Sequence, residues 1–154
     1  MIALKKDGRF IVDMELIKLT ESDLPFLLEV RNHESTRFNL EDDSIFDLSQ
    51  CESWFKLLED PWYIIKVNSI SVGYFRTKGY SVGCDIHPIH RRNGYARKAY
   101  EKYLKDKKYA ELWVFNDNFA KELYESLGFK SSNEHRFSSI IFSIITVKHT
   151  FRNG

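Results

Sequence analysis

The segment Val82 to Leu104, VGCDIHPIHRRNGYARKAYEKYL, decides the fold, because it leads from a strand through a short turn into a helix. Apolar residues alternate with small or polar ones up to His87, which is the two-residue period of a strand with one buried face. Pro88 cannot donate a hydrogen bond to a strand ladder, so it ends the strand. Further on, apolar residues recur at helical spacing, at Ala96, Ala99, Tyr100, Tyr103 and Leu104.

The junction between strand and helix has the character of an anion site. At a helix N-terminus, unpaired backbone N–H groups and the positive end of the helix dipole converge. Gly94 permits a backbone conformation or a close approach that a Cβ would obstruct, and Arg91 and Arg92 add positive charge. The junction therefore predicts a pyrophosphate site, with a plain Gly-containing turn as the alternative for these residues alone.

A second informative stretch is Glu111 to Phe129, ELWVFNDNFAKELYESLGF. Its first part, up to Phe115, is nearly continuously apolar and predicts a buried strand. Loop and cap residues follow, and then apolar residues at helical spacing up to Leu127. Gly128 is the expected C-terminal stop of that helix.

Both stretches resemble one superfamily. The pattern Arg91-x-x-Gly94-x-Ala96 after a strand resembles the acyl-CoA signature of the GCN5-related N-acetyltransferases, and Tyr124 to Phe129 resembles a later block of the same superfamily. The resemblance covers roughly Met14 to Phe151. It implies an α+β fold in which a central, mostly antiparallel, twisted mixed sheet of about six to seven strands is flanked by about four helices. We expect one such domain over residues 1–154.

The resemblance also implies a cosubstrate, acetyl-CoA, and no metal. Pantetheine would run along the strand as an added strand, using backbone groups of Cys84 and Ile86. An Asn often contacts it at the position that Asp117 holds here, so Asn116 and Asn118 are both candidates. The pyrophosphate would lie on backbone N–H groups with Arg91 and Arg92 as charge support, and the residues that supply those groups are Arg92, Asn93, Gly94, Tyr95 and Ala96.

Three residues are the catalytic candidates. Tyr124 stands where many relatives place a tyrosine that protonates the departing thiolate, although its position on an apolar helix stripe is equally explained by packing. Asp85 and His87 share one phase of the strand and are candidates for the base that deprotonates the amine, with ordinary solvated side chains as the alternative. Glu29 is a weaker candidate for the same role.

The N-terminal half carries a looser resemblance. The pair Arg31-Asn32 resembles the first helix of the ribosomal-protein and nucleotide-sugar acetyltransferases, and a polar helix end is the alternative. In the superfamily, the following region walls the acceptor site. The acidic run Glu41 to Asp43 would attract a cationic amine there, unless it is only a solvated loop.

Composition narrows the function. Lys plus Arg number 23 and Asp plus Glu number 22. This nearly balanced charge does not favour nucleic acid or an anionic membrane as a partner. No uncharged apolar run approaches the ~18 residues of a membrane span, and we expect a cytoplasmic protein in which Cys51 and Cys84 are free thiols. The β-branched run from Phe137 to Phe151 predicts a last strand, beside the strand that ends at Phe115 or crossing to a partner, which leaves a homodimer open.

Taken with the resemblance, these features predict an acyl-CoA-dependent N-acyltransferase that moves an acetyl group to a primary amine. The acceptor stays open among a protein N-terminus, a lysine, and a small-molecule or sugar amine. A non-catalytic acyl-CoA-binding or sensing module is the alternative. A nucleic-acid-binding protein is disfavoured by the balanced charge.

Overall fold

The computed structural model describes residues 4–6, 9–11, 13–40, 42–115, 121–136 and 139–144, with side chains for 13–40, 42–112 and 121–130. A seven-stranded sheet forms its centre, in the spatial order β3-β4-β5-β6-β7-β9-β8. The strands are β3 (Met14–Lys18), β4 (Tyr63–Val67), β5 (Ile70–Lys78), β6 (Ser81–Ile86), β7 (Ala110–Phe115), β8 (Lys130–Arg136) and β9 (Ser139–Ile144). A separate hairpin precedes it, made of β1 (Leu4–Lys6) and β2 (Arg9–Ile11).

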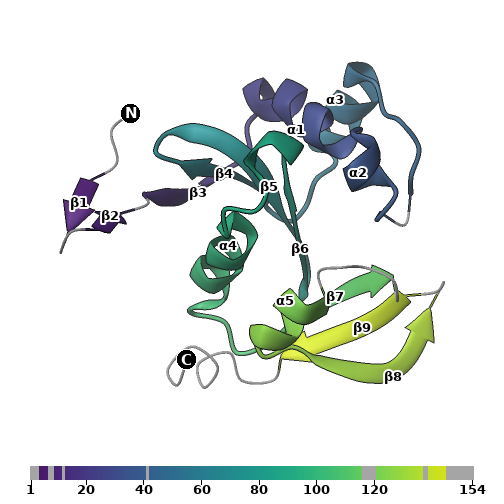
Figure 1. Ribbon diagram of the computed structural model, residues 1–154. Helices are drawn as coiled ribbons and strands as arrows, with labels where there is room; N and C mark the ends of the chain where they lie inside the picture. The colour runs from purple at the N-terminus through teal and green to yellow at the C-terminus, as the bar shows by residue number, and fades with distance from the viewer. Residues whose placement is uncertain are drawn as a thin grey trace.

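Helices cover both faces of the sheet (Figure 1). They are α1 (Leu24–Arg31), α2 (Glu34–Arg37), α3 (Leu48–Lys56), α4 (Tyr95–Leu104) and α5 (Lys121–Ser126), with 3-10 turns η1 (Glu21–Asp23) and η2 (Pro88–His90). All pairings in the sheet are antiparallel except that of β6 with β7. The predicted fold class is confirmed. The additional helix is α2, a single turn that the polar sequence ESTR did not reveal.

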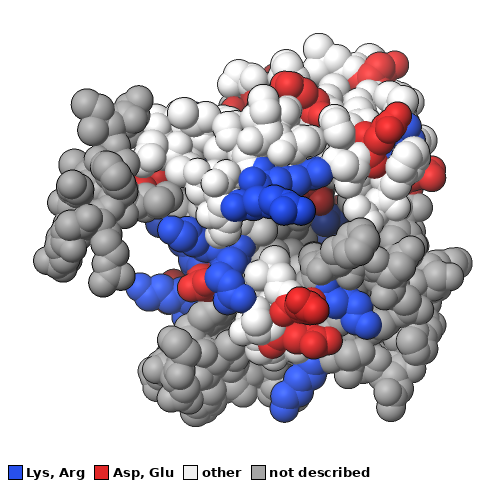
Figure 2. Space-filling view, viewed as in Figure 1, with Lys and Arg blue, Asp and Glu red and all other residues white. Residues whose placement is uncertain are grey.

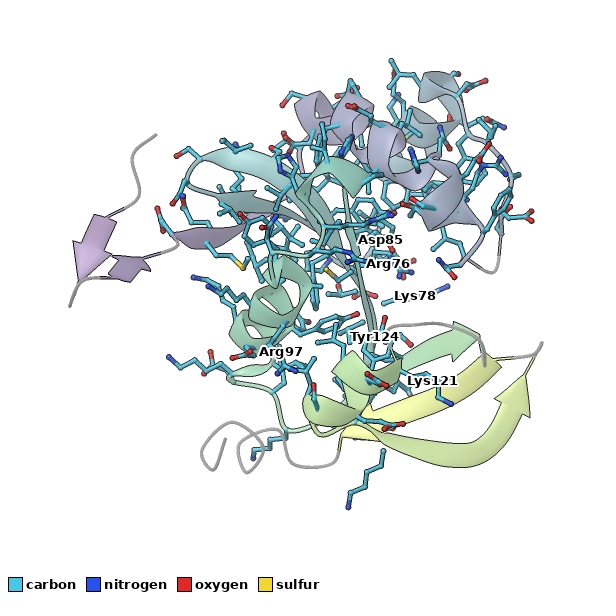
Figure 3. All side chains as sticks on the ribbon, viewed as in Figure 1. Arg76, Lys78, Asp85, Arg97, Lys121 and Tyr124 are labelled. Atoms are coloured by element: carbon cyan, nitrogen blue, oxygen red, sulfur yellow. The ribbon has the colours of Figure 1, made fainter. Side chains whose placement is uncertain are left out.

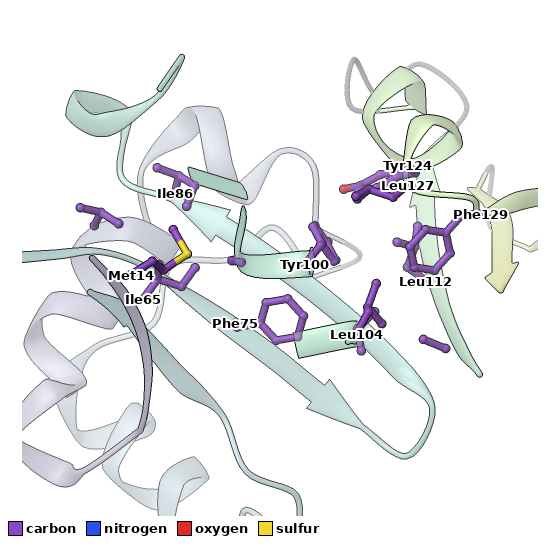
Figure 4. Close-up of a cluster of buried hydrophobic side chains, with 14 of the residues drawn as sticks. Met14, Ile65, Phe75, Ile86, Tyr100, Leu104, Leu112, Tyr124, Leu127 and Phe129 are labelled. Carbon is purple, nitrogen blue, oxygen red and sulfur yellow. The ribbon is translucent and has the colours of Figure 1, made fainter. Parts of the chain in front are cut away.

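Two hydrophobic clusters lie on opposite faces of the sheet. On one face, Phe75 and its neighbours pack against α4, where the Tyr100 ring meets the Phe75 ring edge-on at 5.2 Å between centroids (Figure 4). On the other face, Tyr74 packs with Leu27 and Val30 of α1. Because successive strand residues face opposite ways, each residue of β5 and β6 can be assigned to the α4 side or the α1 side.

The C-terminal part of the sheet contains one confirmed strand and one that the sequence analysis missed. The predicted last strand does lie beside the strand that ends at Phe115, since β9 pairs with β7 along its whole length. The polar segment Lys130–Arg136, for which the sequence predicts no strand, forms β8 at the edge of the sheet. A strand with only one neighbour needs no strongly apolar sequence, which explains why hydrophobic pattern did not identify it.

Within the described residues, no helix has the length and apolar character needed to cross a membrane. Charges of both signs lie on the visible surface. Figure 2 shows basic side chains across the middle of this face, and acidic ones over α1 to α3 and over α5.

Candidate active site

The site begins where β6 and β7 part. In the described part of the chain these parallel strands pair at one position, Ser81 with Glu111, and they diverge beyond it (Figure 1). On its other side β6 pairs with β5, and the His87 N–H donates to the Val72 carbonyl at 2.8 Å. Hydrogen-bonded and non-hydrogen-bonded pairs alternate in an antiparallel ladder.

That alternation decides which backbone groups of β6 are available. Since His87 is hydrogen-bonded to β5, Ile86 and Cys84 occupy the non-hydrogen-bonded positions, and their N–H and C=O groups point away from β5 into the divergence. The Ile86 carbonyl accepts a hydrogen bond from Arg91, and an extended ligand could pair with the remaining groups as an added strand. Cys84 and Ile86 are the two residues that the sequence analysis assigned to pantetheine.

The turn that follows β6 presents backbone donors at the start of α4. Arg92 and Gly94 both have left-handed backbone conformations, with φ of 66° and 74°. The Lys98 N–H makes the first intrahelical bond, to the Gly94 carbonyl at 3.2 Å, so the N–H groups of Tyr95 and Ala96 lack helical partners. A Cβ on Gly94 would meet nothing within 4 Å, which leaves open space in front of the turn. The turn has the form of an anion cradle.

Asn93 and the two arginines have different tasks in this turn. The Asn93 side-chain amide donates to the His90 carbonyl at 3.0 Å and so holds the turn together. The Arg91 guanidinium donates to the Ile86 carbonyl at 3.0 Å, to the Ser35 hydroxyl at 2.5 Å and to the buried Thr36 hydroxyl at 2.9 Å.

Those three bonds tie the cradle to α2, so most of the binding capacity of Arg91 is already used inside the protein. Arg92 is exposed. Of the two predicted charge supports, Arg92 is therefore the one whose side chain stands open to a phosphate.

On the α1 side of the divergence, Asp85 forms an ion pair with Arg76. The Arg76 Nε lies 3.3 Å from Asp85 Oδ2, and the two side chains are 36% and 15% exposed. Burial disfavours the guanidinium charge, but Asp85 and the nearby tyrosines together outweigh this and raise the pKa of Arg76. The predicted base is thus held beside a cation. The sequence offered one overlooked signal, a charged residue inside the otherwise apolar and aromatic segment VGYFRT.

His87 is also engaged. Its Nδ1 accepts a hydrogen bond from the Ile89 N–H at 3.2 Å, and its Nε2 lies 3.1 Å from Glu29 Oε1. A neutral imidazole that accepts at Nδ1 carries its proton on Nε2, so it donates to Glu29 and has no nitrogen left for a substrate proton. The Glu29 side chain is 65% exposed. This pair places an accessible carboxylate on the α1 side of β6.

Tyr124 faces the Arg76–Asp85 pair from across the divergence (Figure 3). Its side chain is 8% exposed and meets the Tyr100 ring edge-on, with 5.8 Å between centroids. Burial raises the pKa of Tyr124 to about 12, with the Tyr100 hydroxyl opposing the shift and the Asp85 charge adding to it. The phenol is therefore packed and also protonated throughout the neutral range. Packing in the core and a role as proton donor are thus compatible for this side chain.

Cys84 lies on the α4 side, partly buried against the cluster around Phe75. Burial, with the nearby Asp85 charge, raises the pKa of the Cys84 thiol despite the opposing effect of Arg76. A thiol held in this form is a poor nucleophile at neutral pH. Cys51 and Cys84 are both free thiols.

The segment that follows α2 is fastened to the end of α1. The Arg31 guanidinium donates to the carbonyls of Ser44 at 2.6 Å and Asp42 at 2.8 Å, and the Asn32 amide exchanges hydrogen bonds with the backbone of Phe46 at 2.8 and 3.1 Å. The pair Arg31-Asn32 thus fastens this segment to the end of α1. No role in binding a substrate is needed to explain it.

The two asparagines predicted to contact pantetheine, Asn116 and Asn118, lie outside the described residues. Among the residues that are described, no group of three or more His, Cys, Asp or Glu side chains is placed to hold a metal ion.

Comparison with solved structures extends this picture. A spermidine N-acetyltransferase from Vibrio cholerae, solved with CoA and spermine, has a TM-score of 0.75 at 18% identity, over 88% of this chain and 97% of that one. A putative acetyltransferase from Salmonella typhimurium, solved with acetyl-CoA, has a TM-score of 0.66 at 20% identity, over 86% and 94%. A ribosomal-protein-alanine N-acetyltransferase from Brucella melitensis has a TM-score of 0.66 at 18% identity, over 85% and 99%.

The fold is that of the GCN5-related N-acetyltransferases. No protein-family model matches the sequence, and no curated protein matches it. At this distance, the N-acetyltransferase fold is established by the three-dimensional arrangement, and the chemistry has to be argued from the residues themselves.

Proposed function

We propose that this protein is an acyl-CoA-dependent N-acyltransferase that moves an acetyl group from acetyl-CoA to a primary amine. The observation that carries the proposal is the divergence of β6 from β7, lined by backbone groups of Cys84 and by the Ile86 N–H that do not face β5, with the cradle before α4 at its end. The CoA and acetyl-CoA found in proteins of the same fold support it.

The residues present fit that cosubstrate. The N–H groups of Tyr95 and Ala96 and the exposed Arg92 would hold the pyrophosphate, while Asn93 and Gly94 give the turn its shape. The backbone of β6 would hold pantetheine. When bound, acetyl-CoA supplies an acyl group activated as a thioester. The chain itself has to orient the amine and handle two protons.

Proton handling is divided between the two sides of the divergence. Tyr124 keeps its proton at neutral pH and is the candidate to donate it to the departing thiolate. On the opposite side, the exposed carboxylate of Glu29, oriented by His87, is the candidate to accept the proton of the amine. Asp85 is held in an ion pair with Arg76. Asp85 is therefore better suited to orienting Arg76 than to accepting a proton.

Thermal unfolding tests the proposal first. A ligand at a hundred times its dissociation constant adds about 2.7 kcal/mol, which raises the midpoint by about 5–10 °C for a chain of this size. We expect acetyl-CoA and CoA to stabilise the protein more than ADP does. No shift with either CoA species at millimolar concentration would refute the proposal.

Arg92→Gly is the variant to compare. Glycine suits the φ of 66° at this position, so the fold should keep its stability while the affinity for CoA falls by about three- to tenfold. Lys108→Ala removes the same charge from an exposed position beyond α4 and should leave the affinity unchanged.

A non-catalytic sensing module is the alternative, and Tyr124→Phe separates it from an enzyme. An enzyme that uses this phenol as its acid should keep its affinity for CoA and lose turnover by about 10²-fold or more. A sensor would show CoA binding and no transfer to any amine with either protein.

A further inference from the structure

Arg76 stands in an unusual position for an arginine. It lies within β5 opposite Gly83 of β6, and a Cβ at Gly83 would overlap its guanidinium. The side chain therefore lies flat over the bare backbone of β6 and reaches Asp85 two residues further on (Figure 3). Only glycine at position 83 leaves room for this arrangement. The guanidinium can therefore lie over β6, beside the gap between β6 and β7.

The N–H donors of the Arg76 guanidinium have no hydrogen-bond partner among the described residues. Its Nε faces Asp85 Oδ2 at 3.3 Å, without the geometry of a hydrogen bond. Among the described residues, no hydrogen bond reaches either Nη atom of Arg76, although its side chain is 36% exposed. A guanidinium offers five N–H donors in a rigid fork that matches a carboxylate. The open edge is thus ready to receive a carboxylate from solution.

The side on which Arg76 lies decides which substrate would bring that carboxylate. Arg76 shares the phase of Tyr74, which packs against α1, whereas Phe75 and Cys84 face α4. The cradle belongs to the α4 side, because it forms the start of that helix. Arg76 therefore faces the α1 side, opposite the cradle, and the amine would approach from this α1 side in the proposed reaction. Lys78, two residues along β5, is exposed and adds positive charge there.

We propose that Arg76 binds a carboxylate of the acceptor, so that the acceptor is an amino acid or a closely similar amine that carries a carboxylate. This inference rests on the proposed N-acyltransferase function. The carboxylates of Asp85 and Glu29 lie on the same side and would attract the amine of the same molecule. A polyamine carries only positive charges, so the positive charges of Arg76 and Lys78 would repel it.

The test compares each acceptor with its own amide. Acetyl transfer from acetyl-CoA is measured for the twenty amino acids and, for those that react, for the corresponding amino-acid amides. We expect kcat/KM for the free acid to exceed that for the amide by about tenfold or more, the size expected for a charge-assisted pair. In Arg76→Gln the ratio should fall to about one, and Arg76→Lys, which keeps the charge without the fork, should lie between.

If Arg76→Gln fails to fold, the ratio of kcat/KM for the free acid to that for the amide in the wild-type protein still tests the inference, because it needs no variant. An equal or better rate with the amides, an unchanged ratio in Arg76→Lys and Arg76→Gln, or transfer to spermidine with none to amino acids would overturn the inference and leave the N-acyltransferase intact. A preference for succinyl-CoA over acetyl-CoA that depends on Arg76 would place the carboxylate on the donor, which also overturns it. Absence of stabilisation by CoA would instead remove the underlying function.

Discussion

The raised pKa of Tyr124 has a measurable consequence for stability. An ordinary tyrosine has a pKa near 10, and burial raises that of Tyr124 to about 12. Between these values the unfolded chain releases a proton that the folded chain retains, so the free energy of unfolding falls as pH rises. The contribution is fully present below pH 10 and is lost as pH approaches 12. With 1.36 kcal/mol per pKa unit, the loss from this one residue reaches about 1.4 kcal/mol at pH 11.

Tyr124→Phe isolates that contribution. Urea or guanidinium unfolding at pH 8.5, 10 and 11 gives the free energy of unfolding of both proteins. Besides burial, Tyr124 also helps to raise the pKa of Tyr100, so the loss of that effect in the variant adds to the difference in the same direction. We expect the wild-type protein to lose about 1.4 kcal/mol more than Tyr124→Phe between pH 8.5 and 11. Equal losses in the two proteins would mean that Tyr124 titrates normally, and the case for a phenol held protonated by burial would fail with it.

Three further predictions concern the strands on either side of the ion pair. Gly73→Ala should lower the free energy of unfolding by about 2 kcal/mol or more, because its Cβ would collide with the backbone carbonyl of Asp85, which cannot move aside; a denaturant midpoint equal to wild type would contradict this. Gly83→Ala should cost about 1 kcal/mol or less, since its Cβ meets only the movable Arg76 guanidinium, but it should reduce the preference for acids over amides in the acetyl-transfer assay. The folded protein should take up no maleimide at Cys84 within minutes at pH 7.5, whereas labelling in urea should reach both of the two cysteines.

The sequence predicted those parts of the fold that depend on local pattern. The strand that ends at Ile86, the turn through Gly94 and the helix that begins at Tyr95 are all present, because alternation, a proline stop and helical spacing act over a few residues. The assignment of Cys84 and Ile86 to a pantetheine-pairing edge agrees with the β6 register and stays a prediction until a ligand is bound.

Pairings between distant segments could not be predicted in the same way. Arg76 and Asp85 are brought together by the register of β5 against β6, and Glu29 meets His87 only because α1 packs on that face. One sequence, without its register, does not show which charged residue a strand acid will face. The edge strand β8 escaped prediction for a different reason. It pairs with the next strand along the chain, β9, but its polar sequence KSSNEHR has no alternating apolar pattern.

Arg91 illustrates how such long-range contacts change the meaning of a motif residue. By charge alone it is a phosphate ligand, yet its guanidinium joins the end of β6 to Ser35 and Thr36 of α2. The turn before α4 and the helix α2 are therefore fixed to each other through this side chain. An arginine suits this position better than a lysine, because three separate acceptors are reached by one planar group. The first arginine of the motif thus holds β6 and α2 together, and in the proposed function it would leave the phosphate to Arg92 and the helix N-terminus.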